Sequence, residues 1–113
     1  CTVVLVGGVS FVSQQQVLHQ HADQVDVVVA TPGRLLGMLN HQVASLDLGC
    51  VKTLVLDEAD RLLDAVFEEE TLAICTAAGV YRDGCSDTRS DTQVLLTSAT
   101  WSSSVDRLAM LIT

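Results

Sequence analysis

The chain has 113 residues, of which 49% are apolar, so it is at most one small domain with enough apolar residues for a packed core. Six Lys and Arg residues stand against fourteen Asp and Glu, which gives a formal net charge of -8. This balance argues against a protein whose main task is to grip nucleic acid through a basic surface. No apolar run has the length of a membrane span and no signal peptide is visible, so we expect no membrane association.

The cysteines give no metal or redox signal, because none of them forms a Cys-x-x-Cys pair. We therefore expect reduced thiols in an intracellular protein of the cytoplasm or nucleus, with an organelle as a further possibility. The chain starts in an apolar run without an initiator Met and ends inside a helix-like pattern, so both ends look cut from something larger. The four cysteines are Cys1, Cys50, Cys75 and Cys85.

The first predicted element is a buried strand over residues 3–6, which stops at Gly7 and Gly8. Ser13 and Gln16 have the spacing of a capping box, which predicts a helix after them. A second buried strand covers residues 27–29.

The second predicted helix begins directly after the second strand. Thr31 is a suitable N-cap, and Pro32 falls at the first helical position, where its missing N–H does no harm. The third predicted strand, over residues 51–56, leads straight into Asp57 and Glu58. After it, apolar residues recur at i, i+3, i+4, i+7 and i+8, which predicts an amphipathic helix. These residues are Ala59, Leu62, Leu63, Val66 and Phe67.

The last third of the sequence repeats this order. Gly79 is a plausible end for the preceding helix, and residues 80–92 have the polar composition of an exposed loop. The fourth predicted strand covers residues 94–96 and leads into Ser98. Ser103 with Asp106 is predicted to cap a final helix, whose inner face is Val105, Leu108, Ala109 and Ile112.

Strand and helix thus alternate four times, which predicts an α/β fold with a parallel sheet flanked by helices on both faces. Polar clusters follow three of the strands, at residues 31–34, 57–60 and 98–100. Because parallel strands end at one edge of their sheet, we expect the three clusters to converge on one crevice. Adjacent carboxylates at such an edge suit a metal-bound nucleotide, since one can hold Mg²⁺ through water while the other takes a proton from an attacking water.

Together these segments resemble the first RecA-like domain of the DEAD-box ATP-dependent RNA helicases. The resemblance covers essentially the whole chain, residues 1–113, and keeps the family's order and approximate spacing. The matching motifs are Gly7-Gly8, Thr31-Pro32-Gly33-Arg34, Asp57-Glu58-Ala59-Asp60 and Ser98-Ala99-Thr100. It implies an incomplete P-loop NTPase domain from an enzyme that couples Mg-ATP hydrolysis to RNA unwinding or ribonucleoprotein remodelling.

The resemblance also implies roles for the carboxylates. Asp57 would bind the Mg²⁺ of Mg-ATP through water, and Glu58 would position and deprotonate the attacking water. Asp60 would hydrogen-bond toward Ser98 and Thr100 and so link the nucleotide state to strand separation. Read alone, Asp57 and Glu58 are also typical of a first helical turn, and Ser98 and Thr100 of an ordinary turn.

The remaining motifs would contact the RNA backbone. A helix N-terminus presents free N–H groups to an anion, and an arginine adds a charge-assisted fork. Such contacts read phosphate and shape rather than sequence. Thr31 is equally well explained as a helix cap alone. The residues that the resemblance assigns to RNA are Gly7, Gly8, Thr31, Pro32, Gly33 and Arg34.

Two features of the family are missing from this sequence. It contains no Gly-x-x-x-x-Gly-Lys-Ser/Thr phosphate loop, and nothing in it corresponds to a second RecA-like domain, which would be a partner of this one. We therefore expect the isolated chain to be inactive. The alternatives are a catalytically silent RecA-like module for RNA or protein association, and a related helicase that acts on DNA.

Overall fold

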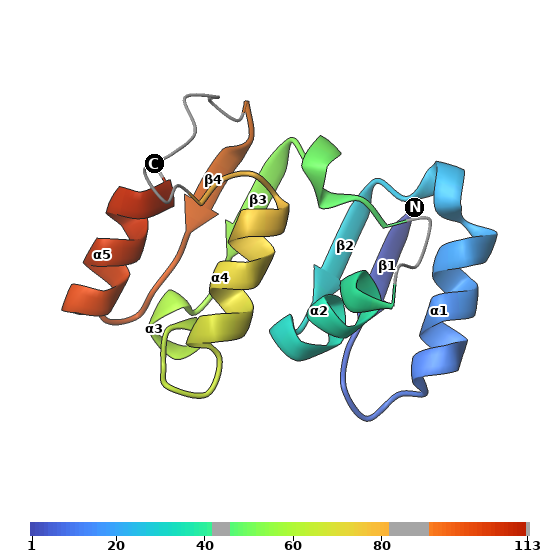
Figure 1. Cartoon of the computed structure of the whole chain (residues 1–113), viewed down its shortest axis with the longest axis horizontal. Helices are drawn as coiled ribbons and strands as arrows, with labels where there is room; N and C mark the ends of the chain where they lie inside the picture. Colours follow the sequence, from blue (N-terminus) through green and yellow to red (C-terminus); the bar gives the residue numbers. More distant parts are fainter. Residues whose placement is uncertain (42–45, 82–90, 113) are drawn as a thin grey trace. The chain divides into compact units, whose positions relative to one another are not determined.

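The structure, a computed structural model, describes residues 1–41, 46–81 and 91–112. The chain divides into two compact units, Cys1–Asp47 and Leu48–Thr113. Each unit contains a pair of parallel strands joined by a helical connection, as the alternating apolar pattern predicted (Figure 1).

The first unit pairs β1 (Thr2–Leu5) with β2 (Val27–Ala30). The connection between these strands holds α1 (Phe11–Gln20) and the short helix η1 (Ala22–Gln24), and α2 (Pro32–Asn40) follows β2 (Figure 1). One apolar core holds the unit together, because alternate side chains of β1 pack against both long helices. Its buried members are Val3, Leu5, Leu18 and Met38.

The second unit pairs β3 (Thr53–Leu56) with β4 (Gln93–Leu96), with Leu56 opposite Leu96. Before β3 lies η2 (Leu48–Cys50), and between the strands lie α3 (Ala59–Leu62) and α4 (Glu68–Ala77). The chain then continues into α5 (Ser103–Ile112), whose buried residues are Val105, Leu108 and Ile112, as its periodicity predicted.

The burial of the strands differs from the prediction, because in each strand exposed side chains alternate with buried or partly buried ones. In β1, Val3 is 3% exposed and Val4 is 53% exposed. In the second unit, Val55 is 56% exposed whereas Leu56 is buried. The expected helical cover is thus present on one face of each strand pair. Continuous apolar runs predicted two-sided burial, but within this chain the side chains alternate.

Two helix starts fall on different residues from those predicted. Helix α1 begins at Phe11 and its N-cap is Ser10, whose Oγ accepts a hydrogen bond from the N–H of Ser13 at 3.3 Å. Ser13 is therefore inside the helix and is not its cap. Similarly, Ser102 Oγ accepts from Val105 N–H at the start of α5, one residue before the predicted cap. Helix boundaries shift in this way because neighbouring serines are equivalent as caps.

The helix after Asp57 is shorter than predicted. It ends at Leu62, and a turn follows in which Asp64 Oδ1 accepts the N–H groups of Val66 and Phe67 at 3.0 and 3.3 Å. The expected apolar face therefore stops at Leu63, and Val66 is 72% exposed. An aspartate that bonds the backbone two and three residues ahead favours a turn over a continued helix.

The end of α4 is as predicted, whereas most of the predicted loop after it lies outside the described residues. Gly79 ends α4 with φ +70°, the left-handed conformation that suits a glycine there. The predicted loop falls largely on residues 82–90, which lie outside the described residues together with 42–45 and 113. Within the described part of the chain, no helix has the length and apolar character needed to cross a membrane.

Candidate functional site

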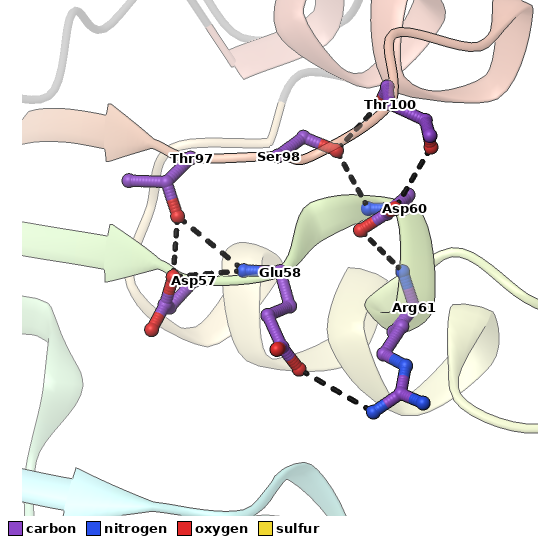
Figure 2. A network of polar contacts seen from close by, with 7 residues as sticks. All are labelled: Asp57, Glu58, Asp60, Arg61, Thr97, Ser98 and Thr100. Atoms are coloured by element: carbon purple, nitrogen blue, oxygen red, sulfur yellow. Dashed lines mark hydrogen bonds and ion pairs between the residues drawn. The ribbon is translucent and has the colours of Figure 1, made fainter.

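The ends of β3 and β4 bring two of the predicted polar clusters together in the second unit. The strands run parallel and in register, and Thr97 N–H continues the ladder by donating to the Leu56 carbonyl at 3.0 Å. The residues that follow β3 therefore lie beside those that follow β4, although about forty positions separate them in the sequence. Figure 2 shows the resulting network of carboxylates and hydroxyls.

Asp60 contacts both members of the second cluster that the sequence assigned to it. Thr100 Oγ1 donates to Asp60 Oδ2 at 2.8 Å, and Asp60 N–H donates to Ser98 Oγ at 3.2 Å (Figure 2). Ser98 Oγ in turn donates to the Thr100 carbonyl at 2.6 Å. The hydrogen bond from Thr100 lowers the pKa of the Asp60 carboxyl below its ordinary value, because it stabilises the ionised form.

Asp57 is held by a residue that the sequence did not mark. Thr97 Oγ1 donates to Asp57 Oδ1, and the same carboxylate oxygen accepts the Glu58 N–H at 3.0 Å (Figure 2). Within the described residues no hydrogen bond reaches the other oxygen, Oδ2. Thr97 precedes the Ser-Ala-Thr triplet, and only the parallel register of β3 and β4 could have pointed to it.

Glu58 adopts an uncommon backbone conformation for a residue with a side chain. Its φ and ψ are 53° and 51°, in the left-handed region, and among the described non-glycine residues it alone has a positive φ. Its carboxylate is exposed, and Glu58 Oε2 lies 3.7 Å from Arg61 Nη1. A left-handed residue between β3 and α3 turns the chain sharply, so that Asp57 and Asp60 flank it (Figure 2).

This set of carboxylates fits a metal held through water rather than in a direct cage. Within residues 1–41, 46–81 and 91–112, no group of three or more acidic, His or Cys side chains could hold a metal ion by itself. Asp57 nevertheless offers one anchored and one open oxygen, and Mg²⁺ in nucleotide sites commonly keeps several waters and takes its other ligands from phosphates.

The predicted RNA-contacting glycines form an open turn in the first unit. Gly8 has φ +83°, which a glycine adopts without strain. A Cβ atom added to Gly7 or Gly8 would meet no heavy atom within 4 Å, so the backbone of this turn is accessible. Internal packing therefore does not require the absence of side chains here.

Helix α2 starts as the sequence predicted, with Thr31 at the N-cap and Pro32 in the first turn. Thr31 makes no capping hydrogen bond through its side chain, and its N–H donates to the Leu5 carbonyl at 3.0 Å. The hydroxyl of Thr31 therefore does not act as the predicted cap. First-turn N–H groups have no partner within a helix, and those at Gly33 and Arg34 suit an anion.

Arg34 is engaged within the protein, which the sequence did not predict. Its Nη1 donates to the Val9 carbonyl at 2.9 Å and to Gln14 Oε1 at 3.0 Å. The guanidinium also lies over the ring of Phe11, at 5.6 Å from its centroid. Gln14 Nε2 donates to the Val6 carbonyl at 3.1 Å, so Arg34 and Gln14 together tie the start of α2 to the glycine turn.

The predicted clusters thus fall into two groups. The turn at Gly7 and Gly8 and the start of α2 belong to the first unit, whereas residues 57–60 and 97–100 belong to the second. The expected convergence of all of them on one crevice stays a prediction.

Comparisons with known proteins agree on one family. A family model described as DEAD/DEAH box helicase matches residues 1–108. The ATP-dependent RNA helicase DBP3 of Cryptococcus neoformans is 41% identical over 108 residues, which cover 96% of this chain and 16% of that protein. The probable ATP-dependent RNA helicase DDX59 of Homo sapiens is 38% identical over 108 residues, 96% of this chain and 15% of that protein.

Solved structures show the same likeness. The yeast DEAD-box splicing factor Prp28 matches with a TM-score of 0.80 and 31% identity, over 99% of this chain and 23% of that one. Mss116p bound to ssRNA and AMP-PNP matches with a TM-score of 0.78 and 32% identity, over 100% of this chain and 21% of that one. The predicted α/β fold of part of a RecA-like domain is confirmed.

Proposed function

This chain belongs to the DEAD/DEAH box helicase family, and from that premise we propose that it is part of the first RecA-like domain of an ATP-dependent RNA helicase. The observation that carries the proposal is the network at the ends of β3 and β4, in which Asp57, Glu58 and Asp60 are held beside the Ser-Ala-Thr segment (Figure 2). The chain spans about one sixth of the length of the two curated relatives named above.

In this proposal the carboxylates serve a phosphoryl transfer. Asp57 Oδ2 would accept a hydrogen bond from a water of the Mg²⁺ shell, and the metal would neutralise charge that develops on the phosphates. Glu58, with its carboxylate exposed next to Asp57, would orient the attacking water and accept its proton. The left-handed turn at Glu58 supports this assignment, because uncommon backbone conformations concentrate at functional sites.

Asp60 would report the nucleotide state. Its bonds with Ser98 and Thr100 join α3 to the segment after β4, and this contact lies at the surface, where it can break and reform. A small movement of the Asp57–Asp60 turn on hydrolysis would therefore reach the start of α5. We propose that this movement is coupled to the release or separation of RNA strands.

The first unit would contact RNA through its backbone. The accessible turn at Gly7 and Gly8 and the start of α2 are tied together by Arg34 and Gln14, and the N–H groups of Gly33 and Arg34 suit phosphate. Mss116p, which the chain resembles, was solved with ssRNA. Contacts of this kind explain how a chain with net charge -8 can belong to an RNA-binding enzyme.

The wider context of the protein is also a proposal. A second RecA-like domain would complete the catalytic site, and we propose an intracellular location without choosing a compartment, because one similar protein of Zea mays is named as chloroplastic. The second candidate function is a catalytically silent RecA-like module for RNA or protein association. Residues 1–113 carry the same motifs in both candidates, so ATP hydrolysis by the full-length protein is the property that separates them.

The deciding experiment uses the full-length protein that contains this chain. We expect Glu58→Gln to abolish RNA-stimulated ATP hydrolysis and to leave ATP binding intact, because the amide keeps the size of the side chain but cannot take a proton. Glu69→Gln, on exposed helix surface in α4, is the matched control and should hydrolyse ATP normally. Equal hydrolysis by Glu58→Gln and wild-type protein would refute the assignment, and a full-length protein without ATPase activity would favour the silent module.

The isolated chain provides a separate measurement. Without a phosphate loop, we expect the purified 113-residue protein to release no phosphate from ATP, with or without RNA and Mg²⁺. Magnesium- and RNA-dependent hydrolysis by this protein would contradict the expectation.

A further inference from the structure

We infer that Thr97 is a positioning residue for the hydrolytic site, because its hydroxyl contacts both the Asp57 carboxylate and the Glu58 backbone. Thr97 Oγ1 donates to Asp57 Oδ1 and accepts the Glu58 N–H at 3.4 Å (Figure 2). The inference rests on the proposed roles of Asp57 and Glu58. It concerns a residue that lies before the Ser-Ala-Thr segment and whose hydroxyl bonds Asp57 and Glu58.

The hydroxyl of Thr97 acts as donor to one partner and as acceptor from the other. A hydroxyl has one proton to donate, which goes to Asp57, and lone pairs that accept, of which one takes the Glu58 N–H. No apolar side chain can reproduce this pair of bonds, and a serine can reproduce both.

The backbone of Thr97 is also hydrogen-bonded to residues on both sides of this turn. Its N–H donates to the Leu56 carbonyl at 3.0 Å, and its carbonyl accepts the Ala59 N–H at 2.9 Å. Residues 56–59 are thus bound to Thr97 before, within and after the turn. Both backbone bonds remain available to any residue except proline, so replacing Thr97 by valine removes the hydroxyl contacts and keeps the strand ladder.

These contacts account for the left-handed conformation of Glu58. For a residue with a Cβ atom this conformation is unfavourable, and it persists only where surrounding contacts impose it. The Glu58 N–H is shared between Asp57 Oδ1 at 3.0 Å and Thr97 Oγ1 at 3.4 Å. Loss of the hydroxyl leaves the N–H with the Asp57 carboxylate alone, which has then lost its own bond to Thr97, and the turn becomes free to relax.

The consequence for chemistry is the orientation of both carboxylates. With Oδ1 held by Thr97, Asp57 presents Oδ2 in one direction, which is where the metal-bound water would lie. With the Glu58 backbone fixed, its side chain leaves the turn from one position. Residues of the segment after β4 therefore have different roles. Thr97 orients Asp57 and Glu58. Ser98 and Thr100 bind Asp60.

The test compares Thr97→Val with Thr97→Ser in the full-length protein. Valine keeps the branched shape and removes the hydroxyl, so we expect kcat for ATP hydrolysis to fall about tenfold or more. The Mg²⁺ concentration for half-maximal rate should rise by a similar factor, while the affinity for RNA stays within about twofold. Serine should restore both values to within about twofold of wild type. Thr53→Val, a surface threonine at the start of β3, is the matched control.

The outcomes distinguish a failure of the proposed role of Thr97 from a failure of the proposed function. If Glu58→Gln abolishes hydrolysis while Thr97→Val keeps the wild-type kcat and Mg²⁺ dependence, the role of Thr97 is refuted and the proposed function stands. If Glu58→Gln hydrolyses ATP normally, the assignment of Glu58 fails, and a wild-type full-length protein without ATPase activity would refute the proposed function itself. Should Thr97→Val not fold, Thr97→Cys replaces it, because a thiol is a weak donor, and the same two losses are expected.

Discussion

The two units solve the same structural problem with different chemistry. Each must fix the loop that follows a strand against an element from elsewhere in the chain. In the first unit the bridge is Gln14, a neutral side chain that is 6% exposed and bonds both Val6 and Arg34. In the second unit the bridges are hydroxyls on exposed carboxylates, such as Thr100 on Asp60 (Figure 2).

The difference shows which contacts can change during function. A buried amide with both ends bonded is costly to disturb, because any broken bond leaves a polar group without water. An exposed hydroxyl can exchange a carboxylate for water at little cost. This difference agrees with the roles that we propose, a fixed surface for RNA backbone in the first unit and a response to bound nucleotide in the second. Three substitutions test this contrast, from the largest expected effect to the smallest.

Gln14→Leu should have the largest effect on stability. The substitution keeps the size of the side chain but removes the partner of the Val6 carbonyl and one acceptor of Arg34. We expect the free energy of unfolding to fall by about 1–3 kcal/mol, the usual cost of unsatisfied buried groups. Urea denaturation of the chain, followed by circular dichroism, measures it.

Gln16→Leu is the control for this experiment, because Gln16 lies on the same helix and is exposed. The control should stay within about 0.5 kcal/mol of wild type. Equal effects of the two substitutions would mean that the Gln14 bridge is no more constraining than a surface contact, and the contrast between the units would fail.

Thr100→Val should change a titration more than it changes stability. Removing the donor that lowers the pKa of Asp60 should raise that pKa toward its ordinary value. Because the folded-state pKa is lowered, ionised Asp60 stabilises the fold above its unfolded pKa, and this contribution is lost as the pH falls through the folded value. In the Thr100→Val variant this pH-dependent stabilisation by ionised Asp60 should be smaller.

Carbon-detected NMR of the Asp60 carboxyl group during an acid titration measures the shift. Thr76→Val, which removes an exposed hydroxyl on α4, should leave the Asp60 titration unchanged. A titration of Asp60 that is the same in Thr100→Val and wild type would show that the hydrogen bond is not formed in solution.

Arg61→Gln should have the smallest effect. Its ion pair with Glu58 spans 3.7 Å between side chains that are 77% and 66% exposed. Exposed pairs of this kind contribute between about 0 and 1 kcal/mol, so we expect a change in unfolding free energy of about 0.5 kcal/mol or less. ATP hydrolysis by the full-length variant should also stay close to wild type. A large loss of hydrolysis would assign Arg61 a role in the site.

The sequence by itself determined the local features of this protein. Continuous apolar runs placed all four strands, and Pro32 and Gly79 marked a helix start and a helix end, because these residues restrict the backbone wherever they occur. The order of the motifs indicated the family and predicted that Asp60 contacts Ser98 and Thr100. The motif residues can be identified from the sequence because their residue types and spacing are distinctive.

The tertiary structure alone decided which ordinary residues hold the motifs. Thr97, Gln14 and Asp64 stand in unremarkable sequence surroundings, and their roles depend on what lies next to them. Thr97 meets Asp57 only because β3 and β4 pair in one register, and a shift by one residue would turn its hydroxyl away. A hydrogen bond depends on distance and direction in space, which the order of residues along a chain does not specify.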